Sequence, residues 1–389
     1  MEGLQNSLNS LEQYCNKWKL TVNVQKTKIV VFRKGGALNR QYRWSYAGNE
    51  IEIVQNFNYL GIVFSSGGSF VQATNTLSGK GLRAMNMLFS VTKNLHTPIH
   101  IMFNLFDSYV LSILNYNCEV WGFLKAENIE RVHKKFCKWL LNVKMTTNTL
   151  SLYAECGRFP LYIERHVRII KYRLKLNTSK SENCILYHIV KNQRYSIEHN
   201  QNVSNWTSKV RKLLQDSGFE EIWLFPESVN INMFIPEFRL RLRDIYIQNW
   251  RTNMNTCTSL YIYREIKLSY VKSEYLEILD NKKYRNVIAK LRLSSHNLAI
   301  ETGRHRQVDR SQRKCTMCDL NDLEDEFHFV LKCPYYSNLR QQFIPRYYVR
   351  HQSVFKFISL INSDRKSVLI KLAKFCIQAS EVRNQVNIN

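Results

Sequence analysis

Three cysteines and one histidine near the carboxyl end have the residue types and the spacing of a metal site. Cys315 and Cys318 are separated by two residues, and His328 and Cys333 follow within the next fifteen positions. Protein zinc is held tetrahedrally by thiolates and imidazoles, and four protein ligands close the shell, as in structural rather than catalytic sites. We therefore predict one structural Zn²⁺ held by Cys315, Cys318, His328 and Cys333.

Two other interpretations of this Cys₃His set remain open. The residues could ligate an iron–sulfur cluster, or three cysteines could stand by chance near a core histidine. Three thiolates and one imidazole at these spacings favour zinc over iron–sulfur ligation. Acidic residues fill the connecting segment, and we expect them to form a solvated face rather than to add ligands: Asp319, Asp322, Glu324, Asp325 and Glu326.

A basic run leads directly into the predicted zinc site. From Lys282 to Lys314 there are ten Lys or Arg and only two acids, Glu301 and Asp309. Guanidinium groups suit bidentate contact with phosphate, and such a run beside a small zinc knuckle is a plausible grip on RNA or DNA. The alternative is a solvated charged linker. The expected nucleic-acid-binding residues in this run are Arg304, Arg306, Arg310, Arg313 and Lys314.

The charge of the whole chain points to the same class of partner. The 389 residues include 56 Lys or Arg and 31 Asp or Glu, a net charge of +25. Solubility of a small domain needs a net charge of only about 2–8, and a large excess attracts polyanions. An acidic membrane surface or an acidic protein is the alternative partner. We find no apolar run long enough to span a membrane and no signal peptide, so we expect a nuclear or cytoplasmic, non-secreted protein.

The elements that must position these residues are predicted to be mainly helical, because Gly and Pro number only 13 and 6. Apolar residues recur at helical spacing over 3–19, and a short β-branched run over 29–32 predicts a strand. Residues 51–64 end at a Ser-Ser-Gly-Gly turn and predict further strands. The pattern also predicts one buried helix over 99–122 and a C-terminal helix over about 354–382.

Four segments occur in the same order as similar segments of non-LTR (LINE-type, jockey-like) retrotransposon reverse transcriptases. The first, LEQYCNKWKLTVNVQKTKIVVFRKGG (11–36), resembles the part that follows the catalytic loop. The second, FNYLGIVFSSGG (57–68), resembles the primer-grip hairpin. The third, YNCEVWG (116–122), belongs to the thumb-like part, and DEFHF with CPYYSNLR (325–340) is similar to the C-terminal zinc knuckle.

The resemblance implies a mainly α fold with a small α+β N-terminal part. It divides the chain into a palm remnant over 1–70, a helical thumb over 71–176, a helical linker over 177–300, and a zinc knuckle with a C-terminal helix over 301–389. In the family, Lys26 or Lys28 would lie near the incoming triphosphate. Tyr59, Leu60 and Gly61 would form the primer grip.

The resemblance also carries a departure from the family. The family places a Tyr/Phe-Ala-Asp-Asp turn, which binds Mg²⁺, just before the helix that opens this chain, and no Asp-Asp pair occurs in this sequence. We therefore expect a C-terminal fragment of an RNA-directed DNA polymerase that binds RNA, DNA or a template–primer duplex, with Mg²⁺ bound only in a complete polymerase. The alternatives are a subunit that completes another, full-length reverse transcriptase in trans, and a relic reading frame without function.

Overall fold

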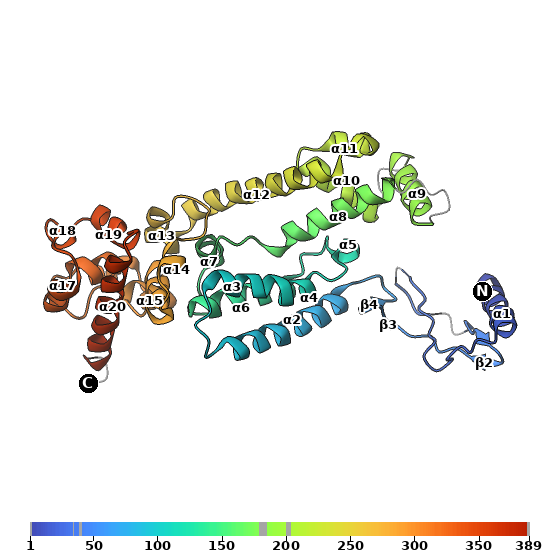
Figure 1. Cartoon of the computed structure of the whole chain (residues 1–389), viewed down its shortest axis with the longest axis horizontal. Helices are drawn as coiled ribbons and strands as arrows, with labels where there is room; N and C mark the ends of the chain where they lie inside the picture. Colours follow the sequence, from blue (N-terminus) through green and yellow to red (C-terminus); the bar gives the residue numbers. More distant parts are fainter. Residues whose placement is uncertain (1, 34, 39–40, 179–184, 200–203, 387–389) are drawn as a thin grey trace.

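The computed structural model describes residues 2–33, 35–38, 41–178, 185–199 and 204–386. The molecule is mainly helical and elongated, with the two termini toward opposite ends (Figure 1). Two layers of helices run between the N-terminal segment and the C-terminal helices. Among the described helices, none combines the length and the apolar character needed to cross a membrane.

The N-terminal segment consists of one helix and two small hairpins: α1 Glu2–Trp18, β1 Ser45–Tyr46, β2 Asn49–Glu50, β3 Asn56–Tyr59 and β4 Ile62–Ser65. The helix predicted over 3–19 is confirmed. The Gln5 side chain attaches it to β1 by donating to the Ser45 carbonyl and accepting from the Ser45 N–H, at 2.9 and 3.0 Å.

The strand predicted over 29–32 is wrong. Ile29 forms a single parallel bridge with Ile53, and the next backbone bond of this segment joins the Arg33 N–H to the Ser66 carbonyl at 2.9 Å. The segment thus changes partner within four residues, so no continuous ladder of backbone hydrogen bonds can form along it.

The β3–β4 hairpin confirms the strands predicted over 51–64 from Asn56 onward, whereas 51–55 contributes only the bridge at Ile53. Its register pairs Asn56 with Ser65 and Tyr59 with Ile62, which leaves Leu60 and Gly61 as a two-residue turn. Both turn residues have positive φ, 47° and 83°. This is the backbone twist of a type I′ turn, which matches the twist of the flanking strands.

The middle of the chain forms a bundle of helices: α2 Val71–Thr92, α3 Ile99–Leu105, the π-helical turn η1 Phe106–Leu111, α4 Ser112–Leu114, α5 Cys118–Trp121, α6 Glu127–Leu141 and α7 Thr149–Cys156. The single helix predicted over 99–122 is wrong beyond Leu114. Asn117 adopts φ of +50° and breaks it. Asn is among the few residue types that tolerate this left-handed conformation.

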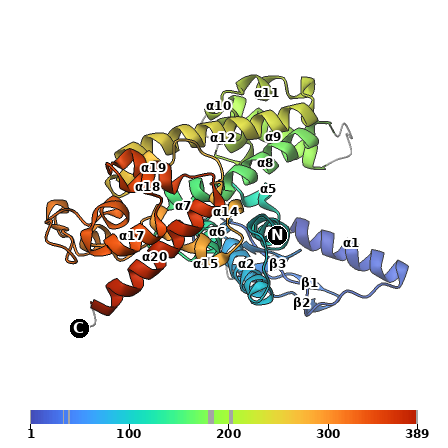
Figure 2. The same ribbon diagram turned by 60° about the vertical axis from the view of Figure 1, so that its left-hand side comes forward.

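The following helices form a second layer beside the bundle, here called the arm (Figure 2): α8 Leu161–Thr178, α9 Ile185–His199, α10 Trp206–Asp216, α11 Glu220–Leu224, the short 3₁₀ helix η2 Pro226–Ser228 and α12 Ile231–Thr256. Helices α8 and α12 pack along each other. Pro236 lies inside α12, where it removes one helical hydrogen bond without ending the helix.

The C-terminal part is built from short helices and turns around one long helix: η3 Thr258–Leu260, α13 Tyr261–Ile266, α14 Tyr275–Ile278, α15 Lys282–Arg292, α16 Ala299–His305, η4 Arg310–Gln312, η5 His328–Lys332, η6 Pro334–Tyr336, α17 Ser337–Phe343, α18 Arg346–Val349, α19 Val354–Ile361 and α20 Lys366–Val386.

The C-terminal helix predicted over 354–382 is two helices, because side chains from elsewhere hold the break between α19 and α20. Arg292 donates to the Ile361 carbonyl at 3.2 Å and to the Asn362 amide oxygen at 2.5 Å. The Asn362 amide donates to the Ile266 carbonyl at 2.9 Å. These bonds satisfy groups at the helix end that would otherwise favour continuing the helix.

Two apolar clusters hold the molecule together. One joins buried residues of 62–161 to those of 250–379, so the middle bundle and the C-terminal part share a core. The other lies between 163 and 242, inside the arm. The four-part division expected from the sequence stays a prediction, because parts that share a core can still have separate origins and roles.

Candidate metal centre and its basic surroundings

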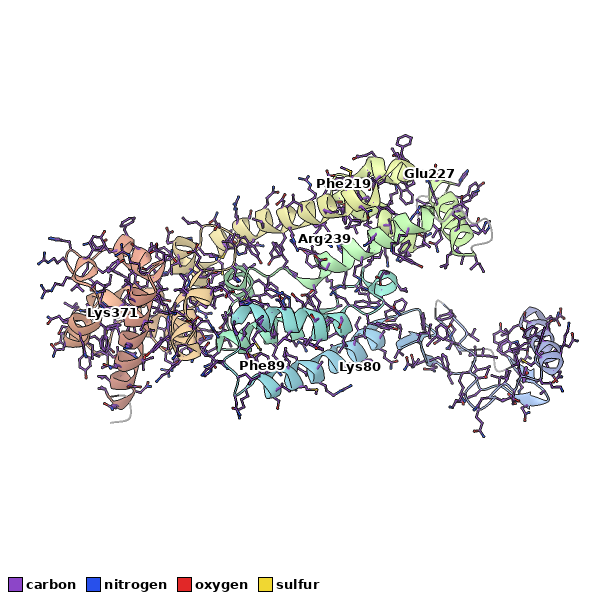
Figure 3. The ribbon with its side chains drawn as sticks, viewed as in Figure 1. Lys80, Phe89, Phe219, Glu227, Arg239 and Lys371 are labelled. Carbon is purple, nitrogen blue, oxygen red and sulfur yellow. The ribbon has the colours of Figure 1, made fainter. Side chains whose placement is uncertain are left out.

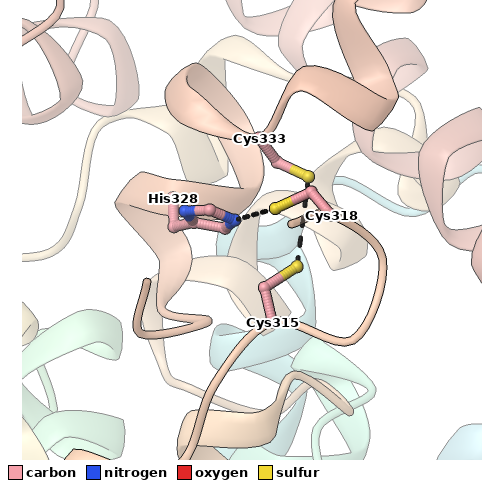
Figure 4. Close-up of side chains that lie close together, drawn as sticks. All are labelled: Cys315, Cys318, His328 and Cys333. Atoms are coloured by element: carbon pink, nitrogen blue, oxygen red, sulfur yellow. Dashed lines mark hydrogen bonds between the residues drawn. The ribbon is translucent and has the colours of Figure 1, made fainter. Parts of the chain in front are cut away.

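The four predicted zinc ligands converge in space (Figure 4). Their donor atoms all lie within 4.8 Å of one another. The sulfurs of Cys315 and Cys333 are 4.0 Å apart, and the Cys318 sulfur is 3.5 Å from Nε2 of His328. A tetrahedral zinc ion with Zn–S bonds of about 2.3 Å sets its ligand atoms roughly 3.5–3.8 Å apart. The cluster could therefore hold a zinc ion with only small movements of its side chains.

Local backbone structure positions each ligand. A bridge between Lys314 and Leu323 closes the loop that carries the first two cysteines. Inside this loop the Met317 N–H donates to the Cys315 sulfur at 3.4 Å. His328 and Cys333 stand at the start and just after the end of the turn η5, where the Cys333 N–H donates to the His328 carbonyl at 2.8 Å. One helical turn thus presents both of the later ligands.

A metal ion that binds here must displace the protons of the cysteine thiols, so their pKa values matter. The hydrogen bond with Cys333 raises the pKa of the Cys315 thiol to about 12 and lowers that of Cys333. Burial raises the pKa of Cys318. Zinc binds thiolates, so binding releases protons and weakens as the pH falls.

The surroundings of the other ring nitrogen of His328, Nδ1, are also those expected when Nε2 binds a metal. Nδ1 is buried without a hydrogen-bond partner, and the Asp322 carboxylate lies 3.8 Å from it. Metal-bound histidines usually donate this N–H to a carboxylate or carbonyl, which fixes the tautomer. Asp322 is therefore placed to orient the imidazole once Nε2 binds a metal.

The expectation that the intervening acids form a solvated face is wrong for two of them. Glu324 and Glu326 are 1% and 2% exposed. Glu324 forms an ion pair with Arg383 of α20, and Glu326 accepts from His296 at 2.9 Å. The reason is that this segment packs into the shared core, where a carboxylate needs a partner. The metal-binding segment is thus part of the shared core and not a separate module on the surface.

The five basic residues predicted to bind nucleic acid beside the metal site differ in their contacts within the protein. Arg304 forms an ion pair with Glu301 at 2.6 Å. Arg313 donates to the carbonyls of Val308 and Ile300 at 2.8–3.1 Å. Lys314 donates to the Asn321 carbonyl at 2.8 Å. These side chains support the local fold, which a count of charges in the sequence could not show.

The remaining two arginines are more available. Arg306 is exposed, and the Arg310 guanidinium lies 4.6 Å from the centre of the Tyr261 ring. Arg310 shares a pocket of about 290 Å³ with Arg304 and Arg313. Three acids line the same pocket, so its charge is largely balanced: Glu301, Asp325 and Glu326.

The candidates in the N-terminal segment lie toward the opposite end of the molecule from these arginines (Figure 1). Lys28 forms an ion pair with Glu52, and Lys26 is exposed. In the hairpin, Tyr59 and Leu60 are 58% and 69% exposed. The structure therefore brings the metal ligands together but does not join the basic run to the lysines of the first segment.

A residue not singled out from the sequence holds the hairpin turn. The Tyr116 hydroxyl donates to the Leu60 carbonyl at 3.0 Å. Gly61 has φ of +83°, which other residues rarely adopt, and a Cβ added there would also lie 3.2 Å from the Tyr116 ring, so glycine is favoured at this position. Two segments that carried the family resemblance, 57–68 and 116–122, thus contact each other. The sequence signal for this was only the presence of a tyrosine at the start of YNCEVWG.

Comparisons with known proteins give one informative similarity. No family model matches the sequence, and no solved structure matches it. A curated Caenorhabditis elegans protein described as transposon-derived and uncharacterized is 26% identical over 141 residues. This similarity supports a transposon-related origin. The match covers 36% of this chain and 50% of that protein, so the chain spans about half the length of this relative.

Proposed function

We propose that this chain is a nucleic-acid-binding part of a non-LTR retrotransposon reverse transcriptase, without the catalytic aspartates. The convergence of the Cys₃His donors beside a basic segment is the observation that carries the proposal. Zinc there would fix the fold of residues 315–333 and thereby the direction in which the neighbouring arginines point. The net charge of +25 and the similarity to a transposon-derived protein support it.

Nucleic-acid binding through the available arginines should depend on salt. Neutralising Z phosphates makes log K fall with log salt at a slope of roughly −0.7Z to −0.9Z. Changing Arg306 and Arg310 to Gln should reduce this slope by about 1.4–1.8 and weaken all sequences alike. Fluorescence anisotropy with a labelled RNA at several salt concentrations measures it. These two residues are better targets than Arg304 and Arg313, whose removal would also disturb the fold.

Two exposed lysines of the arm, Lys191 and Lys209, supply the charge-matched control. Changing both to Gln removes the same charge from α9 and α10, far from the metal site (Figure 1). If the arginine variant keeps the slope and affinity of the unchanged protein, the basic run does not contact the phosphates.

We expect the chain alone to show no polymerase activity. Two-metal phosphoryl transfer requires carboxylates that converge on ions about 3.5–4 Å apart. In the N-terminal segment Glu52 pairs with Lys28, Glu50 lies 3.9 Å from Arg43, and Glu12 accepts from the backbone of β1's turn. Among the described residues, the group of His, Cys, Asp or Glu side chains close enough together to hold a metal ion is the Cys₃His set, which contains no carboxylate.

Primer extension on an RNA template, with Mg²⁺ and then Mn²⁺, tests this expectation. A complete reverse transcriptase added to the same mixture verifies that the template–primer is usable. Extension by the purified chain that disappears when an acid within residues 1–389 is changed would contradict it.

The second candidate, a subunit that completes another reverse transcriptase in trans, is favoured by the surface of α1. Leu4, Leu11 and Trp18 share one face of this helix and are 43%, 42% and 60% exposed. An apolar stripe left open on a helix is suited to packing against another element. Co-purification with a full-length reverse transcriptase that is lost on changing Leu11 and Trp18 to Gln would support it.

A further inference from the structure

A groove of about 550 Å³ lies where three distant segments meet. Residues 142–144, just after α6, form one wall, and residues 287–298 of α15 and its following loop form the second. The third wall is the end of α20, from Cys376 to Asn384. The floor includes Phe329, the neighbour of the zinc ligand His328.

The lining combines an apolar floor with a polar rim that contains no acid. Val287, Leu291, Leu298 and Ile377 provide apolar surface beside Phe329. The polar lining consists of cationic or imidazole side chains, amides and hydroxyls, without any Asp or Glu: Lys144, Lys290, His296, Arg383, Asn142, Asn297, Asn384, Ser295 and Ser380. This differs from the neighbouring pocket around Arg310, where three acids balance three arginines.

Among the described residues, no carboxylate forms an ion pair with two of the lysines in the groove. Lys144 donates to neutral oxygens only, the His296 carbonyl at 2.6 Å and the Asn297 amide at 2.7 Å. The Lys290 ammonium group makes no hydrogen bond or ion pair with another residue that the structure describes. By contrast, Arg383 and His296 are paired with buried carboxylates.

Burial, more than the neighbouring charges, lowers the pKa of Lys144. Glu301 opposes that effect, and the charges of Lys290 and Arg304 lower the pKa further. Like charges held together in a partly buried place are stabilised by a bound anion.

We propose that this groove binds a single-stranded segment of RNA or DNA, with phosphates at Lys144 and Lys290 and a base against the apolar floor. The amides and hydroxyls of the rim can pair with base edges, which an acidic peptide would not require. The volume is within the range of sites for small ligands, about 300–1,000 Å³, and suits one or two nucleotides rather than a duplex. Single strands expose base faces that can lie on apolar surface.

The metal site supports the third wall of this groove. Arg383, which lines the groove on α20, is held by Glu324. Glu324 lies 3.8 Å from the Cys315 sulfur and also accepts from the Ala299 N–H at 2.7 Å. The zinc loop therefore fixes both α20 and the start of α16 at the edge of the groove.

The test uses the full chain with zinc and a fluorescein-labelled oligouridylate of about a dozen nucleotides, a length near the sites of single-strand-binding proteins. Changing Lys144 and Lys290 to Gln should reduce the salt slope for this RNA by about 1.4. Binding of a double-stranded RNA should be unchanged. Because Lys144 also supports the 296–297 loop, Lys290→Gln alone is the second variant and should reduce the slope by about 0.7.

The control changes Lys371 and Lys374 to Gln. Both are exposed on α20 without lining the groove, and Figure 3 labels Lys371. The control should keep the slope and the affinity. Photocrosslinking of a 4-thiouridine RNA should label peptides from 287–298 and 376–384 in the unchanged protein.

This inference rests on the proposed function, and the outcomes separate the two. If the unchanged protein binds RNA but the groove variants behave like the control, and crosslinks fall elsewhere, the groove is not the site although the proposed function stands. Equal loss of single-stranded and duplex binding would overturn the single-strand assignment. No binding of any nucleic acid by the unchanged protein would overturn both, and binding of an acidic peptide at the groove instead of RNA would overturn the inference.

Discussion

Cys318→Ser should remove the zinc ion and unfold the segment around residues 310–340. Structural zinc in small knuckles contributes about 10–16 kcal/mol of apparent binding free energy at neutral pH, as much as the whole stability of many domains. Three of the four ligands are buried here, so their loss also removes support from α20. Elemental analysis should find one zinc per chain in the unchanged protein and none in the variant. Hydrogen exchange should quicken first over 310–340.

A cysteine outside the site provides the control for this experiment. Cys257 is partly buried and lies apart from the four ligands, so Cys257→Ser should keep its zinc. The middle helices α2 and α6 should exchange slowly in both variants, because α2 packs mainly on α6, η1, α4 and β4, and α6 mainly on α2 and α7. Protein purified without chelator that contains no zinc and yet protects 310–340 would contradict the prediction.

Arg292→Met should lower the free energy of unfolding by about 3–5 kcal/mol, the usual effect of breaking a buried ion pair. The Arg292 and Glu155 side chains are 4% and 0% exposed, with Nε and Oε1 2.5 Å apart. Tyr263 and Ser273 donate to the other Glu155 oxygen at 2.9 and 3.0 Å. This network joins α7 of the middle bundle to α15, and Arg292 also holds the break after α19. Denaturant unfolding measures the effect, with Arg251→Met on the exposed side of α12 as the control.

The pH dependence of the unfolding free energy tests whether the buried ion pair causes the destabilisation of Arg292→Met. Burial raises the pKa of Glu155, but the charges of Arg292 and Lys267 outweigh it and hold the pKa below its usual value. The stability from this pair is therefore present at neutral pH and is lost as the pH falls through that lowered pKa. The difference in unfolding free energy between the unchanged protein and Arg292→Met should therefore become smaller at acidic pH. A difference that stays constant from neutral to acidic pH would show that lost packing, rather than the ion pair, causes it.

Local patterns of the sequence were sufficient for the metal ligands and for α1. The spacing of Cys315, Cys318, His328 and Cys333 needs only one loop and one helical turn to bring the donors together, and the structure does so. The β3–β4 hairpin was expected from the family resemblance rather than from the local pattern, which placed its turn at 65–68, whereas the turn is Leu60–Gly61.

Features that depend on partners far along the chain could not be predicted in this way. The break at Asn362 is held by Arg292, seventy residues earlier. The burial of Glu324 depends on Arg383, fifty-nine residues later. For the same reason the sequence could not show which members of the basic run are available, since Arg304 and Arg313 are occupied by neighbours that only the fold brings close.

The shared core has a consequence for how the protein is made. Buried residues of 62–161 pack with residues of 250–379, so the helices within 62–161 leave the ribosome before part of their partner surface has been synthesised. At about 5–20 residues per second, the 218 residues between 161 and 379 take roughly 10–45 s to synthesise. During that time the apolar faces of the middle bundle stay open, whereas the arm over 163–242 can close on itself. The nascent chain should therefore depend on chaperones until the residues up to 379 have emerged.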